Sequence, residues 1–92
     1  MSNQVFAVLL DEPNEQVFEN LQNSYKNNYR HTDVFHLIAV DGDVLTREVA
    51  TKIGIRTDPP IAPGVVIKVQ STAYSGFTDP ALWEWLRNVN KE

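Results

Sequence analysis

The chain has 92 residues, a length that corresponds to one small domain over residues 1–92. Its formal net charge is −4 and its eight Lys and Arg form no basic run, which argues against a nucleic-acid-binding protein, whose affinity comes from neutralising phosphates. The absence of cysteine excludes disulfides, thiolate metal sites and thiol catalysis. No apolar stretch reaches 18 residues, and "MSNQVFAVLLDEP" lacks a basic region, so we expect a cytoplasmic protein with no membrane partner.

The first half of the chain predicts a strand, a helix and a hairpin. "QVFAVLL" is a continuous run of β-forming residues, which is typical of a strand buried on both faces. "PNEQVFENLQNSYKNN" has apolar residues at helical spacing, with Pro13 expected in the first turn and Asn27 or Asn28 in the left-handed geometry that ends helices. "YRHTDVFHLIAV" fits either one long strand or two short ones. Because Thr-Asp is turn chemistry, we favour a hairpin with strands over residues 29–31 and 34–40.

The next segment predicts a second helix, an irregular connection and another strand. "LTREVATKIG" predicts a helix with Thr46 as its N-cap and Gly54 at its C-terminal end. The proline-rich loop over residues 56–64 can be neither helix nor central strand. Long loops often carry function, so ligand binding there stays open as an alternative. "GVVIKV" predicts a strand over residues 65–69, which is expected to continue through a bend to Tyr74.

The last segment, "SGFTDPALWEWLRNVNKE", contains both tryptophans and predicts a third helix. Asp79 precedes a proline, which predicts Asp79 as the N-cap and Pro80 as the first helical residue. Four apolar residues share one helical face, which would pin the helix to the protein body: Leu82, Trp85, Leu86 and Val89. Trp83 lies at the edge of that face, where a tryptophan either packs its ring flank or anchors a partner.

The element order β-α-β-β-α-β with an added C-terminal helix predicts an α+β fold of the ferredoxin-like sandwich type. If residues 29–40 form one strand instead, the order becomes thioredoxin-like, without the cysteine pair. A helix-turn-helix is excluded because "RTDPPIAPG" cannot supply a recognition helix after "LTREVATKIGI". The two histidines, His31 and His36, lack a third ligand at suitable spacing, which argues against a zinc site.

Acidic residues at strand ends raise the possibility of a Mg²⁺ site. Asp11 closes the first strand in "AVLLDEP", and Asp41 and Asp43 follow the strong middle strand. Mg²⁺ prefers carboxylate oxygens, with phosphate as a further ligand. Over residues 5–53, this pattern resembles the small CRISPR-adaptation nuclease family, whose members have an aspartate just after strand one. The resemblance implies a dimeric endonuclease in which Asp11 binds Mg²⁺ across the two-fold axis. The chain departs from the family in lacking basic residues after that aspartate.

The tail "YSGFTDPALWEWL" is similar to the end of a group of small uncharacterised bacterial proteins. Together with the acidic charge and the missing catalytic set, this favours a non-enzymatic protein-interaction module without a cofactor. We expect it to bind a protein partner or a second copy of itself, in a bacterial or phage regulatory or defence setting. The predicted partner-binding residues are Trp83, Tyr74 and Phe77, and the alternative is a Mg²⁺-dependent endonuclease that uses Asp11.

Overall fold

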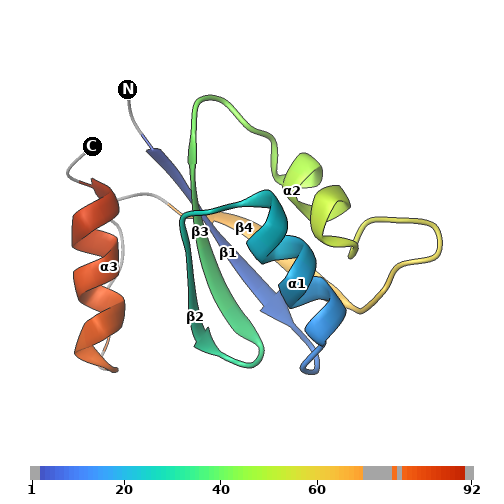
Figure 1. The fold of residues 1–92 in the computed structure, drawn as a ribbon, viewed down its shortest axis with the longest axis horizontal. Coiled ribbons are helices and arrows are strands. Elements are labelled where there is room, and N and C mark those ends of the chain that lie inside the picture. Colours follow the sequence, from blue (N-terminus) through green and yellow to red (C-terminus); the bar gives the residue numbers. More distant parts are fainter. Residues whose placement is uncertain (1–2, 70–75, 77, 91–92) are drawn as a thin grey trace.

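The computed structural model describes residues 3–69, 76 and 78–90 and contains one four-stranded sheet and three helices (Figure 1). The elements are β1 (Asn3–Leu10), α1 (Glu15–Ser24), β2 (Asn28–Thr32), β3 (Phe35–Asp41), α2 (Thr46–Ile53), β4 (Gly64–Val69) and α3 (Pro80–Asn90). The strands lie in the order β2-β3-β1-β4, and all neighbours are antiparallel. The α+β class and the hairpin of β2 and β3 are confirmed. The single long strand over residues 29–40, with the order it implied, is wrong.

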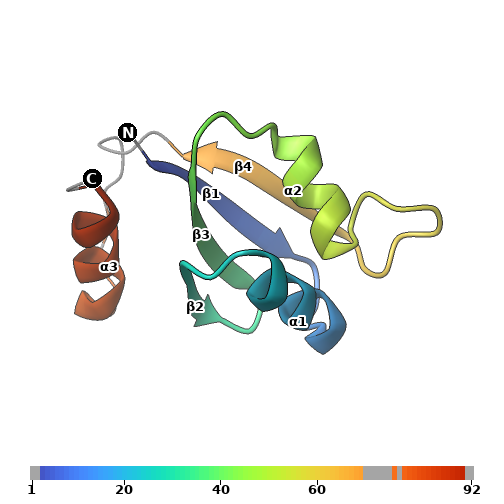
Figure 2. The same ribbon diagram turned by 45° about the horizontal axis from the view of Figure 1, so that its top comes forward.

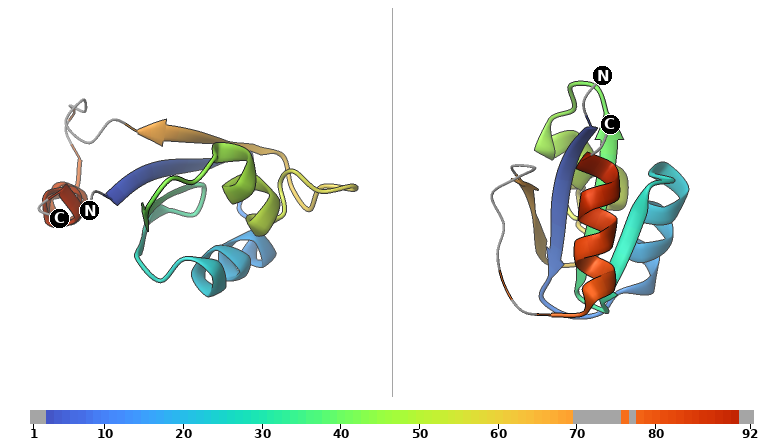
Figure 3. Two further views of the ribbon diagram at one scale, coloured as in Figure 1. Left: turned by 90° about the horizontal axis from the view of Figure 1, so that it is seen from above. Right: turned by 90° about the vertical axis from the view of Figure 1, so that its left-hand side faces the viewer.

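The sheet separates the helices into two layers. Helices α1 and α2 lie on one side of the strands, and α3 lies apart from both (Figure 2). Viewed from the side, α3 is in front of the sheet and α1 is behind it (Figure 3, right). The longest of these helices, α3, has 11 residues, and no helix in the described part of the chain is long and apolar enough to cross a membrane.

Strand β1 is central and carries both faces of the core, as its continuous apolar run predicted. Alternate side chains of a strand point to opposite faces, so Phe6 and Val8 face α1 and α2, whereas Val5 and Ala7 face α3. The first core also contains Leu10, Val17, Leu21, Tyr25, Ile38, Val49, Ile53 and Ala62. The second contains Leu37, Ala39, Leu82, Leu86 and Val89.

The ends of α1 differ from the sequence prediction. Asn14 is the N-cap, and its Oδ1 accepts a hydrogen bond of 3.0 Å from the backbone N–H of Val17, so Pro13 precedes the helix instead of opening it. The helix ends at Tyr25 in extended geometry, and the Asn28 amide donates to the Tyr25 carbonyl at 2.7 Å. The predicted left-handed end at Asn27 or Asn28 is therefore wrong, because a side-chain hydrogen bond stabilises the carbonyl at the C-cap.

The other two helices begin and end near the predicted residues. Helix α2 starts one residue earlier than expected, with Leu45 as its N-cap and no side-chain capping bond, so Thr46 is the first helical residue. Gly54 ends it at φ 100°, a left-handed geometry that favours glycine. The predicted start of α3 is confirmed, since Asp79 Oδ1 accepts from the Ala81 N–H at 3.0 Å.

Candidate interaction surface at the β4 edge

The sheet has two edge strands, and β2 is the protected one. Its ladder to β3 is interrupted by a register shift between Arg30 and Thr32. The Tyr29 ring lies 6.1 Å from the Trp85 ring of α3, and the Arg30 guanidinium carbon lies 4.2 Å from the Phe18 ring centre. Bulges and covering side chains both obstruct the pairing of an edge strand with another chain.

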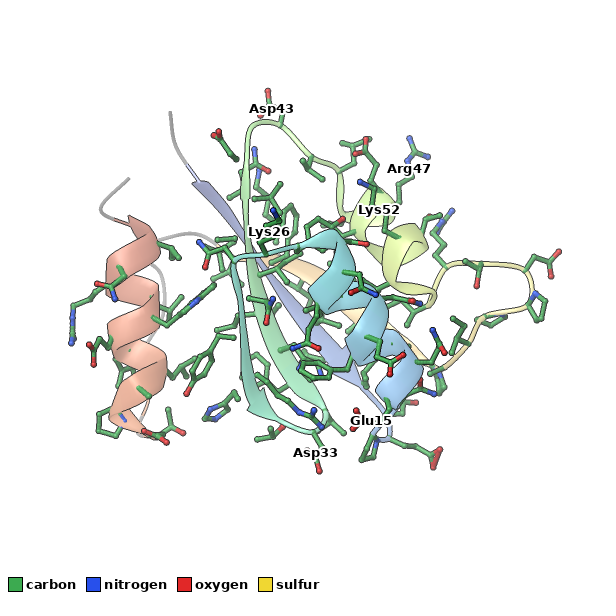
Figure 4. The ribbon with its side chains drawn as sticks, viewed as in Figure 1. Glu15, Lys26, Asp33, Asp43, Arg47 and Lys52 are labelled. Carbon is green, nitrogen blue, oxygen red and sulfur yellow. The ribbon has the colours of Figure 1, made fainter. Side chains whose placement is uncertain are left out.

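Two carboxylates further fix the side chain of Arg30. One guanidinium nitrogen donates to Asp33 Oδ1 at 2.8 Å and to Glu15 Oε1 at 3.2 Å. Figure 4 places Glu15 and Asp33 at the same end of the sheet, where β2 turns into β3. The Arg30 side chain is thus held over the α1 side of β2 by partners from two other segments.

Strand β4 is the open edge. It pairs with β1 from Val5–Val69 to Leu10–Gly64 without a register shift, and it contains no proline between Gly64 and Val69. Val65 is 53% exposed and Ile67 is 50% exposed. Leu9, which is paired with Val65 and half-buried, adds to the same face. We call Leu9, Val65 and Ile67 the β4 strip.

The β4 strip is exposed because α3 covers only part of its face of the sheet. One row of cross-strand neighbours runs Tyr29, Leu37, Ala7 and Ile67. The first three belong to the core beneath α3, whereas Ile67 does not. On the opposite face, Val66 packs against the α1 and α2 core. On this face the half-buried Val66 is partly covered, whereas Val65 and Ile67 on the α3 face are left partly open.

The predicted anchor Trp83 lies at the margin of the α3 core. It is half-buried and packs against that core, so the packing interpretation fits its position. The ring also lies close to Gly76, where a Cβ atom would be 3.6 Å from Trp83 Cη2. Tyr74 and Phe77, the other two predicted partner-binding residues, lie outside the described residues.

The structure places Asp11 at the exposed end of β1. Its backbone N–H donates to the Pro63 carbonyl at 3.1 Å, which ties the end of β1 to the start of β4. Among the described residues, no group of three or more His, Asp or Glu side chains is arranged to hold a metal ion. Asp41 is the last residue of β3 and Asp43 comes two residues later. Because β3 runs antiparallel to β1, both lie at the other end of the sheet.

Among the described residues, His36 is the one buried polar residue. It is 0% exposed, and neither ring nitrogen has a hydrogen-bond partner among the described residues. Its ring stacks on Phe18 at 5.1 Å. Burial lowers the pKa of His36 below its ordinary value of 6.5, and the positive charge of Arg30 lowers this pKa further.

A pocket of about 300 Å³ lies between α2 and β4. Its polar lining comes from the side chains of Thr46, Arg47 and Arg56. Its apolar part is formed by Ala50, Ile55 and Val66. The two ion pairs in the described part of the chain both belong to Arg30, so neither arginine of the pocket pairs with a described carboxylate. We call this the Arg47–Arg56 pocket.

The sequence did not identify β4 as an edge strand. "GVVIKV" is a nearly continuous apolar run that predicts a strand, and only the strand order puts it at an edge. Lys68 within this run was the available signal, since charged residues are common on edge strands.

Comparison with protein-family models, with curated proteins and with solved structures returned no match to this chain.

Proposed function

We propose that this chain is a non-enzymatic protein-interaction module that forms a homodimer by antiparallel pairing of β4 with β4 of a second copy. The observation that carries this proposal is the β4 edge, which is regular, open and lined by the half-exposed Val65 and Ile67. Unpaired strand edges are templates for pairing with another chain, and β2 is obstructed where β4 is not.

The proposal includes a ferredoxin-like fold. The element order β-α-β-β-α-β and the strand order β2-β3-β1-β4 support this assignment. The resemblance noted in the sequence supports a bacterial or phage regulatory or defence setting. In this assignment, α3 is an addition that covers the face of the sheet opposite α1 and α2 (Figure 3).

A second copy is the occupant that best complements this edge. In antiparallel pairing, directly opposed residues point to the same face of the sheet. A two-fold axis at Ile67 places Ile67 opposite Ile67 and Val65 opposite Val69 of the second copy. Each opposed pair on the α3 face is then apolar, and Lys68 meets Val66 instead of a second lysine. The product is one eight-stranded antiparallel sheet.

The expected affinity is modest. Burial of a half-exposed Val or Ile contributes about 1 kcal/mol, and each net backbone hydrogen bond about 0.5–1.5 kcal/mol. These gains compete with an association cost of at least about 4 kcal/mol. We therefore expect a dissociation constant on the order of 10–100 μM.

This dimer does not assemble the Asp11 site of an endonuclease. Asp11 follows Leu10, which pairs with Gly64, so it lies about four residues from the proposed axis at Ile67. At about 3.3 Å per residue, the two Asp11 residues would be roughly 26 Å apart. A Mg²⁺ ion holds its ligands at about 2.0–2.1 Å, so the two residues would not share one ion.

Ile67→Glu is expected to weaken the dimer at least about 100-fold. The change replaces an apolar contact at the axis with two facing carboxylates, which repel each other and lose water on pairing. Sedimentation velocity across about 5–500 μM protein measures the effect, because this range brackets the expected dissociation constant.

Two variants serve as matched controls for this experiment. Leu45 is 55% exposed but lies before α2, so Leu45→Glu adds the same charge elsewhere and should dimerise like the wild type. The Trp83→Ala variant tests the partner-binding residue predicted from the sequence, and we expect this variant to dimerise like the wild type. A wild type that stays monomeric at 500 μM, or a dimer lost in Trp83→Ala and kept in Ile67→Glu, would refute pairing through β4.

A further inference from the structure

We infer that the Arg47–Arg56 pocket binds a phosphate monoester carried on a small apolar or aromatic body. The pocket adjoins the proposed dimer contact at Val65, which belongs to both, but its two arginines lie outside the β4 strip and the site does not depend on the dimer. All of its lining residues come from one copy of the chain, on α2, the start of the proline-rich loop and β4.

The charge of the pocket is the first argument. Two guanidinium groups line it, and the described lining residues include no Asp or Glu. This is notable in a chain whose formal net charge is −4. The hydroxyl of Thr46 adds a third possible donor at the same rim. Arginine presents paired N–H donors that match the oxygens of phosphate and carboxylate groups.

The availability of the two arginines is the second argument. Arg30 is held by Glu15 and Asp33, whereas Arg47 and Arg56 have no such partner among the described residues. The side chain of Arg47 extends from the outer side of α2 (Figure 4). Their guanidinium groups can therefore turn to an incoming anion without first breaking an ion pair with a described carboxylate.

The shape and lining of the pocket indicate the kind of anion. Its volume of about 300 Å³ is at the lower limit of ligand pockets, which span about 300–1,000 Å³. Ala50, Ile55 and Val66 give it an apolar part, which suits a ring or short carbon skeleton. Two positive side chains complement the two charges of a phosphate monoester better than the single charge of a carboxylate.

The backbone holds the two arginines at the two ends of α2. Arg47 is in the first turn, and the backbone N–H of Arg56 donates to the Ala50 carbonyl at 3.1 Å, which folds the chain back against the helix end. The proline-rich loop thus begins by placing a charged residue at the pocket. This gives the loop a role in positioning a ligand group.

A titration with phenyl phosphate, followed by amide chemical shifts of the full chain, tests the assignment. We expect saturable shifts concentrated at residues 46–50, 55–56 and 64–66. Arg47→Gln and Arg56→Gln should each weaken binding about tenfold, the size of effect expected on losing one charged hydrogen bond. Arg87→Gln removes an exposed arginine on α3 and should leave binding unchanged. The dimer variant Ile67→Glu should also bind normally.

Two further titrations identify which part of the ligand is recognised. Inorganic phosphate lacks the apolar body and should bind at least about fourfold more weakly, which is the effect of burying one CH₂-sized group at about 0.8 kcal/mol. Benzoate lacks the second charge and should also bind more weakly. Equal binding of phenyl and inorganic phosphate, equal losses in Arg47→Gln and Arg87→Gln, or shifts that do not saturate would each overturn the assignment.

Discussion

Replacing Phe6 with alanine will lower the free energy of unfolding by about 3–5 kcal/mol, a typical cost for removing a buried phenyl ring. Phe6 is fully buried at the centre of β1, where it packs with Val17, Leu21 and Ile53 beneath α1 and α2. Domains of this size have a total stability of about 5–15 kcal/mol, so this one change removes a large part of it. Urea denaturation followed by tryptophan fluorescence provides the measurement, because Trp83 and Trp85 lie on the α3 face.

Leu45→Ala is the control for the Phe6 variant. Leu45 is a large apolar side chain that is mostly exposed, so its truncation should cost less than about 0.5 kcal/mol. If Phe6→Ala costs as little as Leu45→Ala, then β1 is not the centre of the core.

The second large effect is a loss of stability in mild acid caused by His36. Because burial and Arg30 lower the pKa of His36 in the folded state, the unfolded state binds the proton at higher pH. The full contribution of neutral His36 to the free energy of unfolding is therefore present above about pH 6.5. It decreases as the pH falls below that value toward the folded-state pKa, by up to about 1.4 kcal/mol per pH unit for one proton.

The surroundings of His36 set the strength of this effect. Its stacking partner Phe18 offers no charge, and Arg30 opposes a second positive charge. Glu15 and Asp33 act in the other direction, since their negative charges favour a protonated ring. Both carboxylates also form ion pairs with Arg30. Burial is the largest of these effects, so the pKa of His36 is lowered.

His36→Leu should remove the stability change between pH 7.5 and 5.5, while His31→Gln should keep it. A leucine fills a similar apolar space without unpaired polar atoms, so we expect the stability of His36→Leu at pH 7.5 to stay within about 1 kcal/mol of the wild type. Chemical denaturation at several pH values gives the comparison. An unchanged acid slope in His36→Leu would show that another group causes it.

The fold was predictable where the sequence carried local signals. The hairpin of β2 and β3, the Gly54 end of α2 and the Asp79–Pro80 start of α3 were each identified from residues a few positions apart. The hairpin turn itself lies at residues 33–34, one position later than predicted. The position of β4 was not, because strand order depends on pairing between Val5 and Val69, 64 residues apart. The same nonlocal information decides which side chains of "GVVIKV" remain open.

The candidate sites were less predictable for the same physical reason. Trp83 was a reasonable anchor by residue type, but its exposure depends on how α3 packs against the sheet. The Arg47–Arg56 pocket joins residues from three segments, and neither arginine belongs to a sequence motif. The ring of His36 is covered by Phe18, which comes from a helix 18 residues earlier in the chain.

The most direct test of β4 pairing is an engineered cysteine at the proposed axis. The chain contains no cysteine, so Ile67→Cys introduces a single thiol. Opposed Cα atoms in an antiparallel pair are about 4.5–5.5 Å apart, within the range of disulfides. We predict rapid oxidation of Ile67→Cys to a covalent dimer at 50 μM, about the expected dissociation constant, with Leu45→Cys reacting slowly. Equal rates for the two variants, or no dimer from Ile67→Cys, would contradict pairing through β4 with its axis at Ile67.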